Sequence, residues 1–255
     1  MKPLNIDVTQ YGTVEGISEN IRYALSLGLD ELQMAPCKHD GSFIVVGSGP
    51  SLEFQIDNIR SEQEAGRPIC AVKDAYDYLV SHGITPNLYI SVEPRYRPVK
   101  NPSKSSAFLL ASRCHPDMFR DLKGYCVYLW HSWSEEDDKD LLKAKMCIGG
   151  GSTSGLRAVN VGYCLGYRKI IMYGMDSCLG VKGEKRVSQL TLGKQVSKTN
   201  VIVGDKEFIC NMAMAAQAQD FQHIYTVMPD LSIQVKGGGL LSAIIEERKK
   251  KGFRT

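Results

Sequence analysis

Two glycine-rich loops contain residue types that could hold a phosphate group. The first loop follows an apolar run that starts at Phe43, and it consists of Gly47, Ser48, Gly49, Pro50 and Ser51. Glycine lets a backbone turn sharply and lets a ligand approach peptide N–H groups, and Ser51 can cap a following helix. Because the first N–H groups of a helix are unpaired and lie at the positive end of its dipole, the loop predicts an anion site. The alternative is an ordinary strand-to-helix turn.

The second loop repeats this arrangement further along the chain. Its candidate ligand-binding residues are Gly151, Ser152, Thr153, Ser154 and Gly155. Leu156, Val159 and Tyr163 follow at helical spacing, so this loop also opens a helix. Two such loops at two strand ends predict one crevice with two walls, which we interpret as a nucleotide-binding site.

Two carboxylates that follow predicted strands are candidates for catalysis. Glu93 and Asp176 could each contribute one oxygen to a Mg²⁺ ion that also binds phosphate. Either residue could instead act as a general base toward an acceptor hydroxyl. The alternatives are a turn or cap role for Asp176 and an exposed ion pair with Arg95 for Glu93.

His131 is the third catalytic candidate, and it lies in the aromatic-rich stretch 125–133. It is the histidine best placed for acid–base chemistry. Trp130 and Trp133 flank it, and one of these rings could stack on a base, a pterin or a sugar. Packing in or around the core is the commoner use of tryptophan.

Cationic residues follow several predicted strands. Lys73 and Asp74 come after the second strand and are further nucleotide-binding candidates, whereas Arg95 and Arg97 could neutralise phosphate. Residues 177–206 have no clear apolar period and are basic up to residue 204. This segment could close over a bound substrate, or it could be a solvated surface loop.

The elements that must position these residues alternate along the chain. Short apolar runs predict strands at 43–47, 69–72, 88–92, 107–112, 125–129, 145–148, 169–173 and 224–227. Segments long enough for helical crossovers separate most of them, and an amphipathic helix is expected after Gly237-Gly238-Gly239. The pattern predicts a Rossmann-like α/β fold with a doubly wound, mostly parallel sheet. Ligands bind such sheets at the carboxyl ends of the strands, where the polar residues above gather.

The length of the chain fits one large α/β domain, and its net charge is small. The chain has 255 residues, and no linker-like tract divides it. Residues 1–39 are expected to form an N-terminal helical segment, with a helix over 14–29, packed on a nucleotide-binding domain at 40–255. The formal net charge of +3 is too small to indicate nucleic-acid binding.

Eight cysteines are spread through apolar segments without any Cys-x-x-Cys pair. This pattern favours reduced thiols over a zinc site or a disulfide scaffold. No basic-then-apolar leader begins the sequence, and no apolar run approaches the ~18 residues needed to span a bilayer. We therefore expect a cytoplasmic protein without a membrane span.

Several of these stretches resemble a known family. Four segments are similar to the 6-hydroxymethylpterin diphosphokinase MptE-like family. They are the loop 47–52, the segment His82-Gly-Ile-Thr-Pro-Asn-Leu88 that leads into Ser91-Val-Glu-Pro94, the loop 150–155 and the segment 165–176. The resemblance covers roughly residues 40–230. That family includes archaeal pterin diphosphokinases and domains of bacterial motility-associated glycosyltransferases. The same loops are similar to those of bacterial sialyltransferases that use a CMP-linked sugar.

The chain departs from the sialyltransferases at three places. Those enzymes have Asn at the position of Ser48, another Asn near the end of the second strand, where this chain has Lys73-Asp74, and a catalytic His before the last large helix. Residues 196–207 contain no histidine. The resemblance therefore implies nucleotide-dependent group transfer without fixing the donor.

We expect a transferase with a nucleotide-activated donor, and the favoured donor is a nucleotide sugar. The alternatives are an ATP-dependent diphosphokinase of the 6-hydroxymethylpterin type and a non-catalytic nucleotide-binding protein. The acceptor could be a glycan, a small heterocycle or a nucleic-acid base, and nucleic acid is expected only in that acceptor role. The sequence leaves open whether the chain forms a homo-oligomer.

Overall fold

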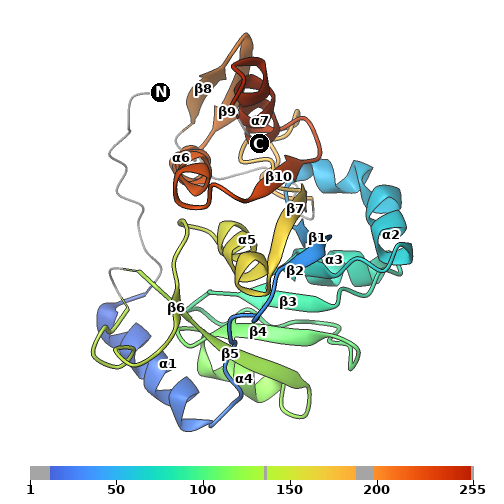
Figure 1. Cartoon of the computed structure of the whole chain (residues 1–255). Helices are drawn as coiled ribbons and strands as arrows, with labels where there is room; N and C mark the ends of the chain where they lie inside the picture. Colours follow the sequence, from blue (N-terminus) through green and yellow to red (C-terminus); the bar gives the residue numbers. More distant parts are fainter. Residues whose placement is uncertain (1–11, 135–136, 188–197, 254–255) are drawn as a thin grey trace.

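The computed structural model describes residues 12–134, 137–187 and 198–253 and shows an eight-stranded sheet flanked by helices (Figure 1). Every pairing between neighbouring strands of this sheet is parallel. In spatial order the strands are β10 (Ser232–Val235), β7 (Tyr167–Tyr173), β1 (His39–Val46), β2 (Ile69–Val72), β3 (Leu88–Ser91), β4 (Ala107–Ala111), β5 (Cys126–Ser132) and β6 (Cys147–Ile148). The predicted Rossmann-like α/β class is confirmed.

The central strands are apolar because helices and loops cover both of their faces. The last four residues of β1 and the last four of β7 are all buried, and they pair in register from Phe43 with Ile170 to Val46 with Tyr173. Continuous burial explains why these strands have no alternation of apolar and polar residues. The core therefore supports the strand end at which the first glycine loop begins.

Seven α-helices lie around the sheet in the part of the chain that the structure describes. They are α1 (Val14–Ser26), α2 (Ile56–Glu64), α3 (Ala75–Ser81), α4 (Pro116–Asp121), α5 (Ser154–Cys164), α6 (Met212–Val227) and α7 (Leu240–Lys250), with a 3₁₀ turn, η1, at Pro50–Phe54. Helix α5 packs across β1, β2, β3, β6 and β7, and α6 and α7 pack on one another. No helix among the described residues is long and apolar enough to cross a membrane.

The strand order reverses direction next to β1. Strands β2 to β6 extend from β1 to one side in chain order, and the chain then returns through α5 to place β7 on the other side of β1. Open parallel sheets bind ligands at such a reversal, outside the carboxyl ends of the strands. The loops after β1 and β7 and the start of α5 lie at this point.

Two sequence predictions about elements need correction, and one strand was not predicted. Residues 224–227, predicted as a strand, form the last turn of α6, where Ile224 is buried against the core. Strand β10 was not predicted, although it forms one edge of the sheet. Part of the expected loop 177–206 belongs to an antiparallel hairpin of β8 (Thr199–Val203) and β9 (Lys206–Cys210).

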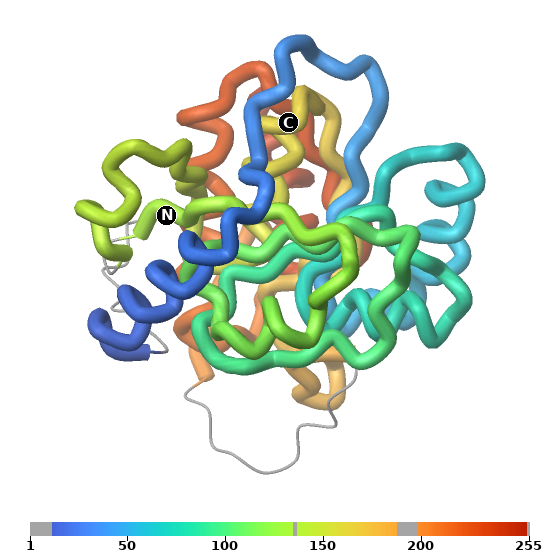
Figure 2. The backbone as a smooth tube through the Cα atoms, turned by 90° about the horizontal axis from the view of Figure 1, so that it is seen from below, coloured from blue at the N-terminus to red at the C-terminus, as the bar shows by residue number. Residues whose placement is uncertain are grey.

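Helix α1 and the residues that follow it up to Leu32 lie on the β5 side of the sheet (Figure 2). The predicted helix is α1, which packs on α4 and ends three residues earlier than expected. The following residues pair with β5, because Leu32 N–H donates to Leu129 O over 2.7 Å and Leu129 N–H donates to Asp30 O over 2.8 Å. The division into a segment 1–39 and a domain 40–255 stays a prediction.

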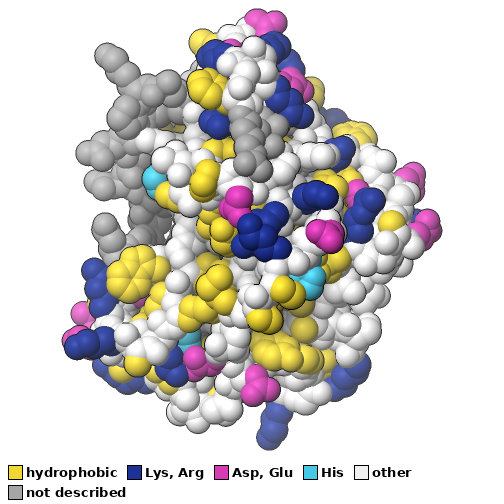
Figure 3. Space-filling model, in the orientation of Figure 1, with side chains coloured by type: hydrophobic (Ala, Val, Ile, Leu, Met, Phe, Trp, Pro, Cys, Tyr) yellow, Lys and Arg dark blue, Asp and Glu magenta, His cyan; other side chains and the backbone are white. Residues whose placement is uncertain are grey.

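Charged side chains of both signs are mixed on the face of the molecule that Figure 3 shows. Lys, Arg, Asp and Glu are interspersed with apolar residues on the face shown in Figure 3, in keeping with the small net charge of +3. All eight cysteines are free thiols in the structure. Cys70, Cys114, Cys178 and Cys210 are buried, whereas Cys37 and Cys126 are exposed.

Candidate functional site

A cavity of about 520 Å³ lies at the carboxyl ends of β1, β2, β3 and β7. It also reaches the first turns of α5 and α6. The lining residues include Gly47 to Pro50, Lys73, Glu93, Arg95, Arg97, Arg113, Ser152 to Gly155, Arg157, Met175 to Cys178, Lys185, Arg186, Asn211, Met214 and Gln217. Segments far apart in the sequence therefore form one pocket, which we call the donor pocket.

Most sequence-predicted site residues lie in or beside this pocket. Both glycine loops line it, as do Lys73, Glu93 and Asp176. Three predicted residues are next to the lining: Ser51 N–H donates to Asp176, Asp74 pairs with Arg186, and Gly151 O accepts from Arg157. Only His131 lies apart from them all.

The first loop needs its glycines for close packing. Gly49 has an ordinary φ of −66°, so the turn itself does not require glycine there. A Cβ atom at Gly49 would overlap the Asp176 carboxylate and lie 2.7 Å from Gly174 O, and a Cβ at Gly47 would also lie 2.7 Å from Gly174 O. The loop after β1 thus lies directly against the segment that follows β7.

Asp176 is buried at the point where this packing occurs. Its Oδ2 accepts a hydrogen bond from Ser51 N–H over 3.0 Å, and only 6% of the residue is exposed. Burial raises the pKa of Asp176 above its usual value, because a charged carboxylate loses solvation there. The environment therefore favours a carboxyl group that can take up a proton.

A third glycine loop completes the wall around Asp176. A Cβ at Gly239 would lie 2.6 Å from Asp176 Cα, and one at Gly237 would lie 2.8 Å from Ser51 Oγ. Gly237 also has a φ of +115°, which glycine adopts readily. Sequence reasoning treated Gly237-Gly238-Gly239 only as a helix start, because nothing in the sequence places β10 beside β7.

Glu93 holds two cations of the donor pocket. Lys73 Nζ lies 2.9 Å from Glu93 Oε2, and Arg95 Nε lies 2.7 Å from Glu93 Oε1. Although burial opposes ionisation, hydrogen bonds from Arg95 and the nearby charge of Lys73 lower the pKa of Glu93 to about 2. Lys73 adopts a left-handed backbone with φ +50°, which is uncommon outside glycine and occurs at functional sites.

These contacts bear on the predicted Mg²⁺ site. Both oxygens of Glu93 already accept from cationic side chains, so a divalent cation would have to displace Lys73 or Arg95. The described residues contain no group of three or more His, Cys, Asp or Glu placed to hold a metal. The arrangement of Glu93 and Asp176 therefore does not fit a magnesium site, and Mg²⁺ stays a prediction from sequence.

Lysine and arginine side chains crowd the pocket. Burial and then the neighbouring charges of Arg186 and Lys73 lower the pKa of Lys185. Lys185 and Arg186 belong to the basic segment that follows Asp176, and Val187 N–H donates to Ser48 O over 3.0 Å. The described part of this segment thus forms one wall of the pocket, whereas residues 188–197 lie outside the described residues and its closure as a lid stays a prediction.

The first turn of α5 faces the pocket. Thr153 is the N-cap, and its Oγ1 accepts from Leu156 N–H and from Gln217 Nε2, the latter over 3.0 Å. Ser154 is buried, and its Oγ has no hydrogen-bond partner among the residues that the structure describes. The Ser154 hydroxyl oxygen is itself buried, so it lies behind the surface of the pocket rather than on it.

Sequence reasoning missed the contributions of two helices. Arg157 enters from α5, where Nε donates to Gly151 O over 3.1 Å, and Asn211 and Gln217 enter from the start of α6. The sequence signal for the start of α6 was Asn211, because Asn is a preferred N-cap residue. In the structure its side chain accepts a hydrogen bond from Met214 N–H. Placing α6 beside α5 required the tertiary structure.

His131 is buried within a separate cluster. Its Nε2 lies 3.4 Å from Glu31 Oε2, and burial lowers its pKa. Trp130 is in the core, whereas 52% of Trp133 is exposed. None of the three lines the donor pocket, so a catalytic role for His131 stays a prediction that this placement does not favour.

Together, the parallel sheet and its glycine-lined, cationic pocket define a Rossmann-like α/β protein with a pocket at the strand-order reversal. The chain belongs to the 6-hydroxymethylpterin diphosphokinase MptE-like family, whose model matches residues 16–182. This match confirms the family predicted from the sequence motifs.

A solved structure shares the fold. It is the MAf glycosyltransferase from Magnetospirillum magneticum AMB-1, with a TM-score of 0.63 and 14% sequence identity. The match covers 96% of this chain and 43% of the glycosyltransferase chain, so this chain spans less than half of that protein's length. No curated protein matches the chain by sequence.

Proposed function

We propose that this chain is a transferase that uses a nucleotide-activated donor, and that the donor is a nucleotide sugar. The observation that carries the proposal is the composition of the donor pocket. Two glycine loops and the first turn of α5 meet there, and the lining contains seven Lys and Arg side chains and two carboxylates: Lys73, Arg95, Arg97, Arg113, Arg157, Lys185, Arg186, Glu93 and Asp176. Arg113 and Arg186 also pair with Asp137 and Asp74 just outside the lining, so seven cations face four carboxylates. This excess of positive charge suits a phosphate-bearing ligand.

The donor phosphates would lie between the Gly47–Ser51 loop and α5. Backbone N–H groups at the start of α5 would donate to the phosphate oxygens. Lys73 and Arg95, held by Glu93, would neutralise charge on the leaving nucleotide. Glu93 then acts as a positioning residue for two cations.

Asp176 would act as the general base. Its raised pKa and buried position suit removal of a proton from the acceptor hydroxyl. The acceptor oxygen would form a bond to the anomeric carbon as the bond from that carbon to the donor phosphate breaks. The electron pair would leave with the nucleotide, and the proton would stay on Asp176.

A diphosphokinase is the second candidate, and the family match favours it. In that reaction the acceptor hydroxyl would attack the β-phosphorus of ATP, and AMP would leave. The same cations and the same base could serve both reactions. Glu93 was a predicted Mg²⁺ ligand, and its charge is already neutralised by Lys73 and Arg95. This pairing favours glycosyl transfer over the reaction with Mg–ATP.

A substrate panel tests the proposal. Melting temperature is measured with nucleoside mono-, di- and triphosphates and nucleotide sugars, each with and without Mg²⁺, and stabilising donors are then assayed for turnover. Stabilisation and turnover with a nucleotide sugar support the first candidate, whereas turnover with Mg–ATP alone supports the second. Binding without turnover across a broad acceptor set would support a non-catalytic nucleotide-binding protein, and no stabilisation by any nucleotide would overturn the proposal.

A further inference from the structure

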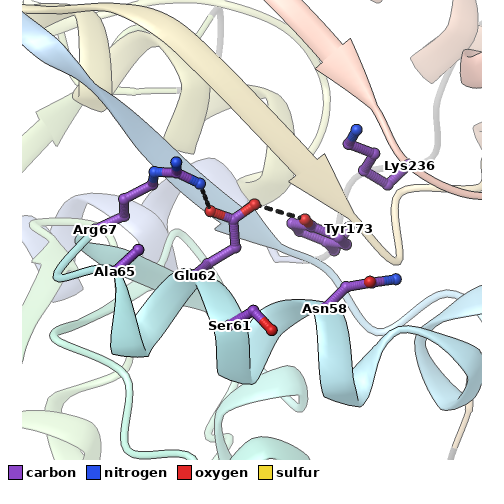
Figure 4. A pocket seen from close by; sticks show the side chains of 7 residues that line it. All are labelled: Asn58, Ser61, Glu62, Ala65, Arg67, Tyr173 and Lys236. Carbon is purple, nitrogen blue, oxygen red and sulfur yellow. Dashed lines mark hydrogen bonds and ion pairs between the residues drawn. The ribbon is translucent and has the colours of Figure 1, made fainter.

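A second cavity lies between α2 and the ends of β7 and β10 (Figure 4). Its volume is about 440 Å³, and it is open to solvent, because only Glu62 and Tyr173 of its lining residues are buried. It is lined by Asn58, Ser61, Glu62, Ala65, Arg67, Tyr173 and Lys236. None of these residues lines the donor pocket, so the two cavities have separate linings.

The floor of this cavity is a buried, fully engaged carboxylate. Tyr173 and Glu62 are 2% and 7% exposed, and Tyr173 Oη donates to Glu62 Oε1 over 2.8 Å. Arg67 forms an ion pair with the other oxygen, Oε2. Because both oxygens have partners and the charge is balanced, Glu62 offers little to a cationic ligand.

The cations of the cavity exceed its single carboxylate. Figure 4 shows Glu62 and Tyr173 between Arg67 and Lys236. Within the described part of the chain, no ion pair or side-chain hydrogen bond involves the Lys236 ammonium. One carboxylate against two cations leaves one positive charge, and Asn58 and Ser61 add polar groups at the edge.

We propose that this cavity is a second ligand site, which binds the phosphate or carboxylate group of a small molecule. Lys236 and the outer N–H groups of Arg67 would contact the oxyanion, and Asn58 and Ser61 would contact hydroxyl groups of the ligand. Glu62 and Tyr173 would fix the position of Arg67. The proposal does not depend on the transfer reaction assigned to the donor pocket.

The two sites are connected through the chain. Tyr173 precedes Asp176 by three residues, and Lys236 precedes Gly237, which packs against Ser51. A ligand in the second cavity would therefore contact the segments that hold Asp176. The binding test nevertheless needs no activity measurement.

NMR titration tests the second site. Backbone amide shifts are followed while inorganic phosphate and, separately, acetate are added to the whole chain. Amides of residues 58–67 and 236–238 report the second cavity, and those of 152–155 report the donor pocket. The titration is repeated with Lys236→Gln and with the control Lys123→Gln, which removes an exposed lysine after α4.

We expect saturable shifts at the second cavity that weaken ~5-fold in Lys236→Gln, the size of a partly exposed ion pair, and stay unchanged in Lys123→Gln. Tighter binding of phosphate than of acetate would identify a phosphate ligand, and the reverse would identify a carboxylate. Shifts confined to 152–155 would overturn the second site while supporting the donor pocket. Shifts at the second cavity that both variants reduce equally, or that neither reduces, would mean an adventitious ion only.

Discussion

At the scale of single residues, Asp176 is the side chain that several loops of the pocket contact. Ser51 donates to it from the loop after β1, and Gly49 and Gly239 leave room for it from two different loops. Burial raises its pKa. In the folded chain the protonated form is therefore favoured relative to the unfolded chain, and the free energy of unfolding falls as pH rises through the folded pKa.

Replacing Asp176 by Asn separates catalysis from stability. Asn keeps the shape and can accept from Ser51 N–H, but it has no ionisable carboxylate. We expect turnover to fall by ~10²-fold or more, the size of lost general-base assistance. We also expect the free energy of unfolding at neutral pH to stay equal or rise, since no desolvated charge remains.

Enzyme assays and urea unfolding over a range of pH measure both effects of Asp176→Asn. The stability difference from the natural sequence should shrink in acid, where the carboxyl group is protonated. Near-normal turnover would remove Asp176 as the base and leave Glu93 and His131 as candidates.

Glu93→Gln tests whether this carboxylate positions cations or binds metal. A folded pKa of about 2, against 4.5 for a free side chain, means that the ion pairs stabilise the fold above pH 4.5 and that this contribution is lost as pH falls toward 2. We expect a loss of about 1–2 kcal/mol at neutral pH, discounted for solvent screening. Chemical unfolding at neutral pH and in acid measures this loss.

Donor binding by Glu93→Gln completes that test. The variant leaves Lys73 and Arg95 without the carboxylate that positions them, so we expect weaker metal-free donor binding. Isothermal calorimetry measures it. A variant of unchanged stability whose Mg²⁺ requirement rises sharply would instead support Glu93 as a metal ligand.

Gly49→Ala tests the close packing of the first loop. The added Cβ would overlap the Asp176 carboxylate, so we expect a loss of about 1–3 kcal/mol in unfolding free energy and reduced donor affinity. Gly238→Ala is the matched control in a neighbouring loop, because a Cβ there meets nothing within 4 Å. Equal stability of the two variants, by thermal or urea unfolding, would contradict the packing argument.

At the scale of elements, the first turn of α5 links the sheet to α6. Thr153 caps α5 and accepts from Gln217 of α6, so one hydroxyl serves both helices. We expect Thr153→Val to lower the unfolding free energy by ~1 kcal/mol and to weaken donor binding, whereas Thr153→Ser keeps both. Urea unfolding and calorimetric titration measure these effects, and a stable Thr153→Val with full donor affinity would refute the role of the cap.

The sequence predicted the elements of the sheet centre better than those of its edge. Phe43–Val46 and Ile170–Tyr173 are continuous apolar runs because they are buried on both faces, and their position was correct. Residues 224–227 are β-branched and aromatic, yet they continue α6 because Ile224 packs into the core. The edge strand β10 has only one buried apolar residue, Ile233, and therefore gave a weak signal in the sequence.

At the scale of the whole molecule, the sequence predicted which strand ends hold polar residues but not how their side chains pair. The glycine loops and Asp176 were found because sheets of this class gather ligands at the carboxyl ends of strands. Three features of the structure depend on contacts between segments that are distant in the sequence. Glu93 pairs with Lys73, Arg157 and Gln217 line the donor pocket, and His131 is buried against Glu31. No local pattern encodes such contacts, so the charge balance of the pocket required the structure.

The central claim is that the donor pocket binds the phosphates of an activated nucleotide. A crystal structure of the chain, grown with the nucleotide that raises its melting temperature most, tests this directly. We predict ordered phosphate oxygens between the Gly47–Ser51 loop and the first turn of α5, within hydrogen-bond distance of backbone N–H groups of that turn and beside Lys73. A nucleotide bound elsewhere at full occupancy, with this pocket unchanged, would contradict the account.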